Sequence, residues 1–137
     1  MSLDNGWFPG HLRELSQAEC LEQLDAHHVG RVAYCDADGP VVVPVNYVRD
    51  GESVLIRLAP ESALARSLDS TPASFQVDEF DDFTQSGWSV LLRGTASYVD
   101  PDDHPATRHL RPWAEGERTR HVRIVATRIT GRRLLEA

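Results

Sequence analysis

The chain has 137 residues, of which 41% are hydrophobic and 26% charged, and its formal net charge is -7. This size and apolar fraction fit one folded domain and exclude a disordered chain, while 9 glycines and 8 prolines exclude a collagen-like or low-complexity protein. No apolar run approaches the ~18 to 20 residues of a membrane helix, and no basic segment followed by an apolar stretch opens the chain. We therefore expect one domain over residues 1–137, in the cytoplasm and without a membrane partner.

The positive charges are all arginines, and they are unevenly distributed. Between Arg108 and Arg133 there are eight arginines and two glutamates, whereas the rest of the chain has six arginines and nineteen acidic residues. An acidic chain with a basic last third is a poor binder of nucleic acid, so no such partner is expected. The basic third suits a small anion, an acidic face of a partner copy, or a solvated surface.

The first 15 residues show no clear period and are expected to form an irregular N-terminal arm. A helix is predicted to start at Ser16, because this residue can cap the helix and Glu19 completes a capping box. The apolar stripe that follows is short, so the helix should end near His28.

Three strand-like runs come next, at residues 31–35, 40–49 and 53–58. The segment 36–39 and the dipeptide Asp50-Gly51, which separate them, are typical of hairpin turns. The three runs therefore predict an antiparallel meander.

The second half predicts a short helix at 61–68 and strands at 73–78, 88–99 and 120–129. Gly94 lies inside the longest of these strands and indicates a bulge or a bend. In all, the sequence predicts a mainly β (α+β) fold, in which six mostly antiparallel strands close into a small barrel with short flanking helices.

Familiar catalytic motifs are missing from the sequence. It contains no G-x-S-x-G nucleophile elbow, no zinc spacing among its six histidines, no G-x-G-x-x-G and no P-loop. The acidic run at 78–82 lacks the spacing and the glycine of a calcium loop, so no metal site is expected.

One segment favours a binding site. Arg57 lies at the end of a strand and Ser62 at the start of the next helix, a pairing of guanidinium, hydroxyl and backbone N–H groups that suits a phosphate. Pro44 cannot donate a hydrogen bond, so its strand should lie at an edge or a bulge, with neighbouring backbone groups available to a flat heteroatom-bearing ring. An ordinary edge strand followed by an ordinary helix would give the same pattern.

Several segments also follow one another in a characteristic order. They are Gly30-Arg31-Val32-Ala33, Pro44-Val45-Asn46-Tyr47, Arg57, Phe75-Gln76-Val77-Asp78, Gly87-Trp88-Ser89-Val90-Leu91-Leu92-Arg93-Gly94-Thr95-Ala96 and Ile129-Thr130-Gly131-Arg132-Arg133-Leu134. In this combination the chain resembles the pyridoxamine 5'-phosphate oxidase-like superfamily, and most of all its small nitroimidazole-resistance-type branch. The resemblance spans about residues 13–134.

This resemblance implies a split β-barrel that forms a homodimer, with FMN sites across the interface. The implied contacts of the flavin ring are Val43, Pro44, Val45 and Asn46. The implied contacts of the phosphate are Arg57 and Ser62. The residues implied close to the flavin of the same or the partner chain are Trp88, Arg132 and Arg133.

Two positions depart from the family's pattern. Leu58 stands where members often have Thr, and Ala63 where they often have Lys, and both changes remove phosphate ligands. Since a charge-assisted hydrogen bond contributes ~1.5 to 3 kcal/mol, the loss of one weakens FMN binding about tenfold to a hundredfold. Arg66, three residues after Ala63, is the candidate replacement cation. The deazaflavin F420 is the alternative cofactor, and haem, which other relatives bind, stays open.

The activity that the resemblance implies is that of an oxidoreductase, in which the flavin N5 carries the hydride to or from a small-molecule substrate. This chemistry needs no protein nucleophile and leaves the substrate unspecified. The competing interpretation is a non-catalytic module that binds FMN, F420 or haem, or a barrel that has lost its cofactor. Leu58 and Ala63 favour this second interpretation.

Overall fold

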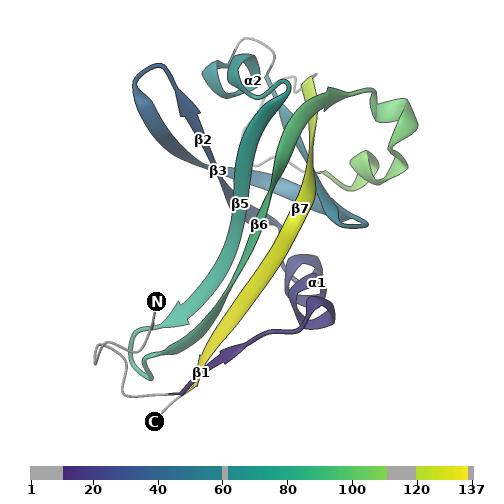
Figure 1. Cartoon of the computed structure of the whole chain (residues 1–137). Helices are drawn as coiled ribbons and strands as arrows, with labels where there is room; N and C mark the ends of the chain where they lie inside the picture. Colours follow the sequence, from purple (N-terminus) through teal and green to yellow (C-terminus); the bar gives the residue numbers. More distant parts are fainter. Residues whose placement is uncertain (1–10, 60–61, 111–119, 136–137) are drawn as a thin grey trace.

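The computed structural model describes residues 11–59, 62–110 and 120–135, which form the strands and helices of Figure 1. In chain order these elements are β1 (His11–Glu14), α1 (Gln17–Asp25), β2 (Val29–Asp36), β3 (Gly39–Asp50), β4 (Ser53–Leu58), α2 (Ala63–Ser67), β5 (Thr71–Asp81), β6 (Ser86–Val99), the 3-10 helices η1 (Pro101–Asp103) and η2 (Pro105–His109), and β7 (Arg120–Leu135).

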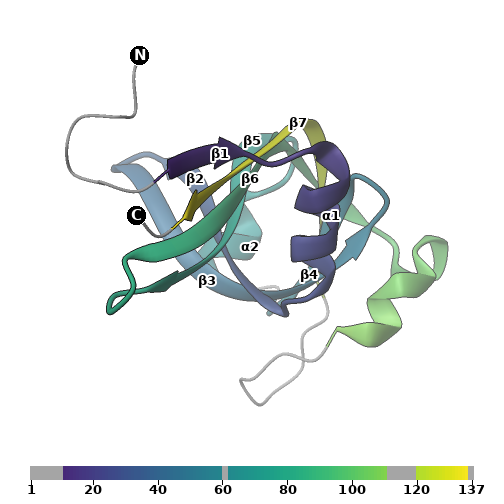
Figure 2. The ribbon, with the colours of Figure 1, turned by 90° about the horizontal axis from the view of Figure 1, so that it is seen from below.

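Six strands close into a ring. The strand order is β1-β7-β4-β3-β2-β5-β6, all pairs are antiparallel, and β6 also pairs with β7. Figure 2 shows this ring from one end, with α1 at its side. The predicted mainly β barrel with short helices is therefore confirmed, its six expected strands being β2 to β7.

The structure adds a strand at the N-terminal end of the described chain. Residues 11–14, expected to be irregular, form β1 and pair with residues 132–135. The end of β7 was also predicted wrongly, because this strand passes Gly131 and continues to Leu135. A Cβ atom on Gly131 would lie 2.7 Å from Cys20 Sγ, so the glycine allows β7 to approach α1 closely.

Both α-helices are shorter than predicted. α1 ends at Asp25 instead of near His28, because the His28 carbonyl accepts a hydrogen bond from the Tyr47 N–H and so joins the chain to the sheet. α2 spans Ala63–Ser67, and the expected first residue of this helix, Glu61, lies outside the described residues. The loop expected after residue 110 also falls largely outside them.

The barrel interior is apolar and well filled. Val32, Phe75, Leu92 and Ile124 are fully buried, and the Tyr47 and Phe75 rings meet edge to face at 4.7 Å. Burial of each large apolar side chain contributes about 1.5 to 3 kcal/mol relative to exposure. Within the described ranges no helix is long and apolar enough to cross a membrane.

The predicted irregularity at Gly94 is confirmed as a bulge in the pairing of β6 with β7. Arg93 lies opposite Arg128 and Gly94 opposite Ala126, so Thr127 is the extra residue. A Cβ atom on Gly94 would lie 1.9 Å from the Val125 carbonyl oxygen, which explains why a residue without a side chain stands here.

Candidate functional site

The expected ring-binding segment lies where β3 changes its partners. Residues 39–46 of β3 pair with β2, whereas residues 47–50 pair with β4. Within the described chain, residues 39–45 therefore have a strand partner on one side only, and we call their other side the open β3 edge. Pro44 lies on it, which confirms the prediction of an edge position.

The expected ring contacts are found together at this edge. Val43 and Val45 are half-buried and pack against the core, while Pro44 is exposed. Asn46 follows them, directly before the residues that pair with β4. The alternation leaves the exposed backbone of the edge flanked by apolar side chains, an environment suited to one face of a planar ring.

The expected phosphate contacts lie at the α2 end of the barrel. Arg57 is half-buried on β4, opposite His121 of β7. Ser62 caps α2, its hydroxyl accepting from the Ala65 N–H at 3.1 Å, and Arg66 is exposed in the last turn. A capping hydroxyl keeps its own hydrogen for donation, so Ser62 can still serve an anion.

The two departures from the family's pattern differ in their surroundings. Leu58 is 9% exposed and belongs to the core of the barrel, whereas Ala63 is exposed on α2. Neither side chain offers a polar atom that could bind a phosphate.

A further cation at the α2 end was missed by the sequence interpretation. Arg120 lies opposite Leu58 in the β4–β7 pairing, and its guanidinium carbon is 4.2 Å from the centre of the Tyr98 ring. The Tyr98 hydroxyl donates to the Ala65 carbonyl of α2. The only sequence signal of Arg120 is that it belongs to the basic last third, because its contact with Tyr98 is created by strand pairing.

The remaining expected contacts lie at the other end of the sheet. Trp88 of β6 is opposite Arg133 of β7, and Ser89 is opposite Arg132. Trp88 is 8% exposed and packs on His27, with ring centres 4.9 Å apart. His27 Nε2 lies 3.2 Å from Glu79 Oε2.

An open hollow of about 450 Å³ adjoins Trp88 at the β5–β6 hairpin. Its lining includes Phe80 and the carboxylates of Glu79, Asp81 and Asp82. The described residues contain no group of three or more side chains placed to hold a metal ion.

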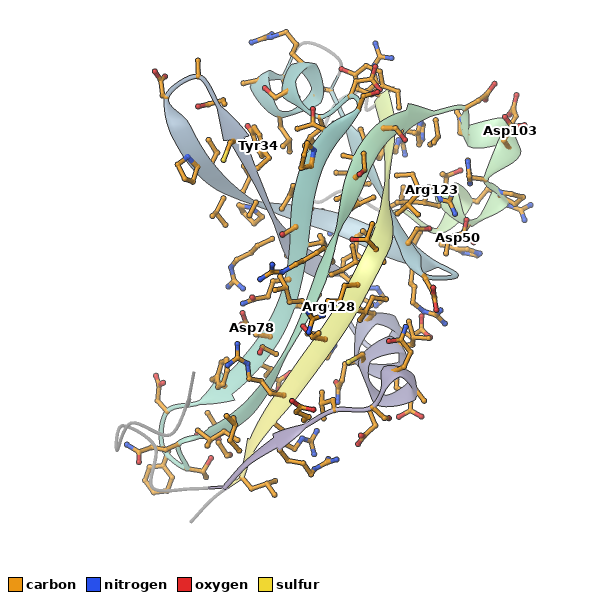
Figure 3. All side chains as sticks on the ribbon, in the orientation of Figure 1. Tyr34, Asp50, Asp78, Asp103, Arg123 and Arg128 are labelled. Carbon is orange, nitrogen blue, oxygen red and sulfur yellow. The ribbon has the colours of Figure 1, made fainter. Side chains whose placement is uncertain are left out.

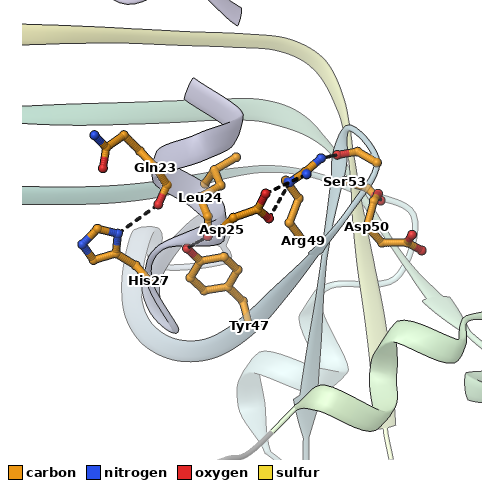
Figure 4. A network of polar contacts seen from close by, with 9 residues as sticks. Gln23, Leu24, Asp25, His27, Tyr47, Arg49, Asp50 and Ser53 are labelled. Atoms are coloured by element: carbon orange, nitrogen blue, oxygen red, sulfur yellow. Dashed lines mark hydrogen bonds and ion pairs between the residues drawn. The ribbon is translucent and has the colours of Figure 1, made fainter. Parts of the chain in front are cut away.

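A polar network fixes α1 beside the end of β3 (Figure 4). Arg49 Nε and Nη2 each donate to the Asp25 carboxylate at 2.8 Å, which lowers the pKa of that carboxyl from its ordinary value. The buried Tyr47 hydroxyl donates to the Leu24 carbonyl at the end of α1, and burial raises the pKa of this phenol. The open β3 edge therefore leads into a firmly anchored segment.

The structure separates the expected contacts into two groups within one chain. Tyr98, beside α2, and Trp88 are ten residues apart on β6, a distance of about 33 Å along an extended strand. Figure 1 shows α2 and β1 at opposite ends of the long sheet. One chain thus places Arg57, Ser62 and Arg66 at the α2 end, and Trp88, Arg132 and Arg133 at the other end.

Comparison with known proteins gives a consistent result. Residues 16–133 match the family model described as pyridoxamine 5'-phosphate oxidase. The uncharacterised protein Rv0080 of Mycobacterium tuberculosis is 30% identical over 129 residues, which cover 89% of this chain and 85% of that protein.

Solved structures share both the fold and part of the sequence. The structure of the FAD binding protein from Mycobacterium smegmatis is 29% identical, covers 90% of this chain and 98% of its own, and has a TM-score of 0.70. A conserved protein of unknown function from Corynebacterium diphtheriae is 30% identical, with the same two coverages and a TM-score of 0.71.

Proposed function

Because the chain belongs to the pyridoxamine 5'-phosphate oxidase family, we propose that it binds a flavin nucleotide and works as a homodimeric oxidoreductase, with its flavin sites across the interface between two copies. The observation that carries the proposal is the similarity to the FAD binding protein of Mycobacterium smegmatis over nearly the whole of both chains. The substrate is a small molecule whose identity stays open.

The residues of this chain fit such a cofactor. The open β3 edge offers backbone groups and apolar side chains to a flat ring. At the α2 end, Arg57, Arg66 and Arg120 supply positive charge and Ser62 a hydroxyl, which together suit a phosphate. These guanidinium groups are the proposed substitutes for the ligands lost at Leu58 and Ala63.

The proposed dimer follows from the separation of the two groups of contacts. Since the group containing Trp88 and Arg133 is too far from Arg57 to share a flavin within one chain, we assign it to the flavin held by the partner copy. A two-fold pair would then complete two equivalent sites.

FMN and FAD share the ring and the phosphate nearest to it. FMN is the cofactor that the sequence resemblance implies, whereas the Mycobacterium smegmatis relative supports FAD. When bound, either flavin supplies hydride transfer through its ring, so the chain needs only to bind and orient the cofactor and admit substrate.

An absorbance spectrum of the purified protein tests flavin binding. We expect bands near ~450 nm that survive desalting after incubation with FMN or FAD. Arg57→Ala should raise the flavin Kd about tenfold to a hundredfold, because it removes a charge-assisted contact to the phosphate. Arg108→Ala, at an exposed arginine of η2, is the matched control and should leave the Kd unchanged.

The outcomes separate the alternatives. A protein without flavin bands after both incubations would contradict the proposal and direct the same titration to F420 and haem. Retained bands that NAD(P)H cannot bleach would favour the second candidate, a non-catalytic flavin-binding module. The apolar Leu58 and Ala63 support this candidate.

A further inference from the structure

His27 follows α1 and lies directly on the ring of Trp88, the tryptophan that we assign to the flavin of the partner copy. The two ring centres are 4.9 Å apart, and the ring planes meet at 56°. Trp88 is buried and His27 is half-buried. A change in the charge or the position of His27 therefore acts directly on Trp88.

Both nitrogen atoms of the His27 ring face oxygen atoms. Nδ1 lies 2.9 Å from the Gln23 carbonyl oxygen, one turn earlier on α1 (Figure 4), and Nε2 lies 3.2 Å from Glu79 Oε2 of β5. A carbonyl oxygen and an ionised carboxylate can only accept hydrogen bonds. A neutral imidazole has one N–H and would turn a lone pair towards one of these oxygens, whereas the cation has two N–H groups. With an ionised Glu79, both contacts are therefore hydrogen bonds only when His27 carries a positive charge.

Glu79 is the charged neighbour that Trp88 shares with His27. Glu79 and Trp88 are Cα partners in the β5–β6 register, and Arg133 of β7 is the other partner of Trp88, so these three side chains lie on one face of the sheet. Asp81 lies on the same face, two residues beyond Glu79 on β5. Among these charged groups, Glu79 is the one within hydrogen-bonding distance of His27.

Two further carboxylates are close in sequence but are engaged elsewhere. Asp25 of α1 belongs to the polar network beside the end of β3. Asp78, labelled in Figure 3, lies on the opposite face of β5 from Glu79 and forms a salt bridge with Arg31 at 3.1 Å. The positive charge of His27 is therefore matched by Glu79.

We propose that charged His27 positions Trp88 for the flavin of the partner copy, so that flavin binding weakens when the ring loses its proton. The positive ring is attracted to the indole and holds Glu79, which joins the end of α1 to β5. Loss of the charge turns a lone pair towards an oxygen and releases one of the two contacts, which leaves Trp88 less firmly held. This inference rests on the proposed flavin site between two copies and adds a regulation of that site by pH.

Tryptophan fluorescence tests the contact before any flavin is added. Trp7→Phe/Trp113→Phe leaves Trp88 as the single tryptophan of the full chain. A protonated imidazole in contact with an indole quenches its emission, and histidine ordinarily changes its charge between about pH 5 and 8. We therefore expect the Trp88 emission to rise across this range. His27→Gln, which keeps an N–H donor but cannot be charged, should abolish the rise. Glu79→Gln should move the rise to lower pH, because it removes the carboxylate that holds the proton.

Titration with FAD tests the consequence for the cofactor site. FAD is the probe because its two phosphate groups keep their charge across this range, whereas a phosphate monoester such as that of FMN titrates near about pH 6. We expect the FAD Kd of the wild-type chain to rise about threefold from about pH 5 to 8, the effect of a partly exposed ion pair. His27→Gln should lack this rise.

The matched control is His28→Gln, at the exposed neighbouring histidine. It should keep both the emission rise of Trp88 and the pH dependence of the FAD Kd. Circular dichroism confirms that each variant is folded.

Each result decides the question. A Trp88 emission that does not change with pH, or a rise that persists in His27→Gln, would overturn the charged contact, while retained flavin bands would leave the cofactor proposal standing. A wild-type FAD Kd that is equal at both ends of the range, or a Kd rise that His27→Gln retains, would overturn the regulation. A chain that binds no flavin at any pH would overturn both proposals.

Discussion

Glu19 joins β1 to the start of α1 through one carboxylate. Its oxygens accept from Arg13 Nη1 and Nη2 at 3.2 and 3.1 Å, and Oε1 also accepts from the Ser16 N–H at 2.9 Å. The hydrogen bonds from Arg13, and then that from Ser16, lower the pKa of Glu19 from 4.5 to about 2. The ionised side chain thus holds β1 to the start of α1.

This lowered pKa predicts a pH dependence of stability. Because the folded pKa lies below the unfolded one, the contribution of Glu19 is complete above pH 4.5 and is lost as the pH falls towards 2. We expect Glu19→Gln to lower the free energy of unfolding at pH 7, and the difference from wild type to shrink across this window. Denaturant titrations at a series of pH values measure it. Glu22→Gln, on the same helix, is the control, and an unchanged difference down to pH 2 would contradict the assignment.

Single residues differ in how far the sequence reveals their role. The edge position of Pro44 was predictable, because the missing donor of a proline is a property of that residue alone. The position of Arg120 beside Tyr98 was not, because it depends on the pairing of β7 with β6, in which Tyr98 lies opposite Val122. Local chemistry can be predicted from sequence, whereas neighbourhoods created by strand pairing need the fold.

At the scale of elements, Gly94 controls how β6 meets β7. Gly94→Ala should lower the free energy of unfolding by about 1 to 3 kcal/mol, because its Cβ would overlap the Val125 carbonyl. Thr95→Ala, at the exposed neighbouring position, should change it by less than about 0.5 kcal/mol. Chemical denaturation of both variants checks this, and equal stabilities would show that the bulge can move to relieve the overlap.

The elements of the ring were predicted because each carries its own signal. Hairpin turns and alternating apolar residues mark β2 to β7, and the capping box marks α1. β1 and the end of β7 have no such pattern, since they stabilise each other by pairing. The continuation of β7 past Gly131 was missed because a glycine usually indicates the end of a strand. Here the glycine instead allows β7 to pack closely on Cys20.

At the scale of the whole molecule, the separated contacts predict complementation between copies. Arg57→Ala and Arg133→Ala should each weaken flavin binding at both sites of a homodimer. In a mixed dimer one site contains both substitutions and the other neither, so flavin binding should return to about a quarter of all sites when subunits exchange freely. Flavin content of the mixture after desalting measures this. No recovery would mean that each site takes both arginines from one chain, or that the arginines serve no flavin site.

The open β3 edge has a further consequence, for solubility. A strand edge with unpaired backbone groups invites strands of other molecules, and the residues here, Val41 to Val45, are four valines and one proline. Four valines around a residue that could donate would be a strong seed for cross-β aggregation. Pro44 removes one backbone N–H donor from within this run. The residue that keeps the edge available for a ring-shaped ligand therefore also protects the chain from aggregation by strand addition.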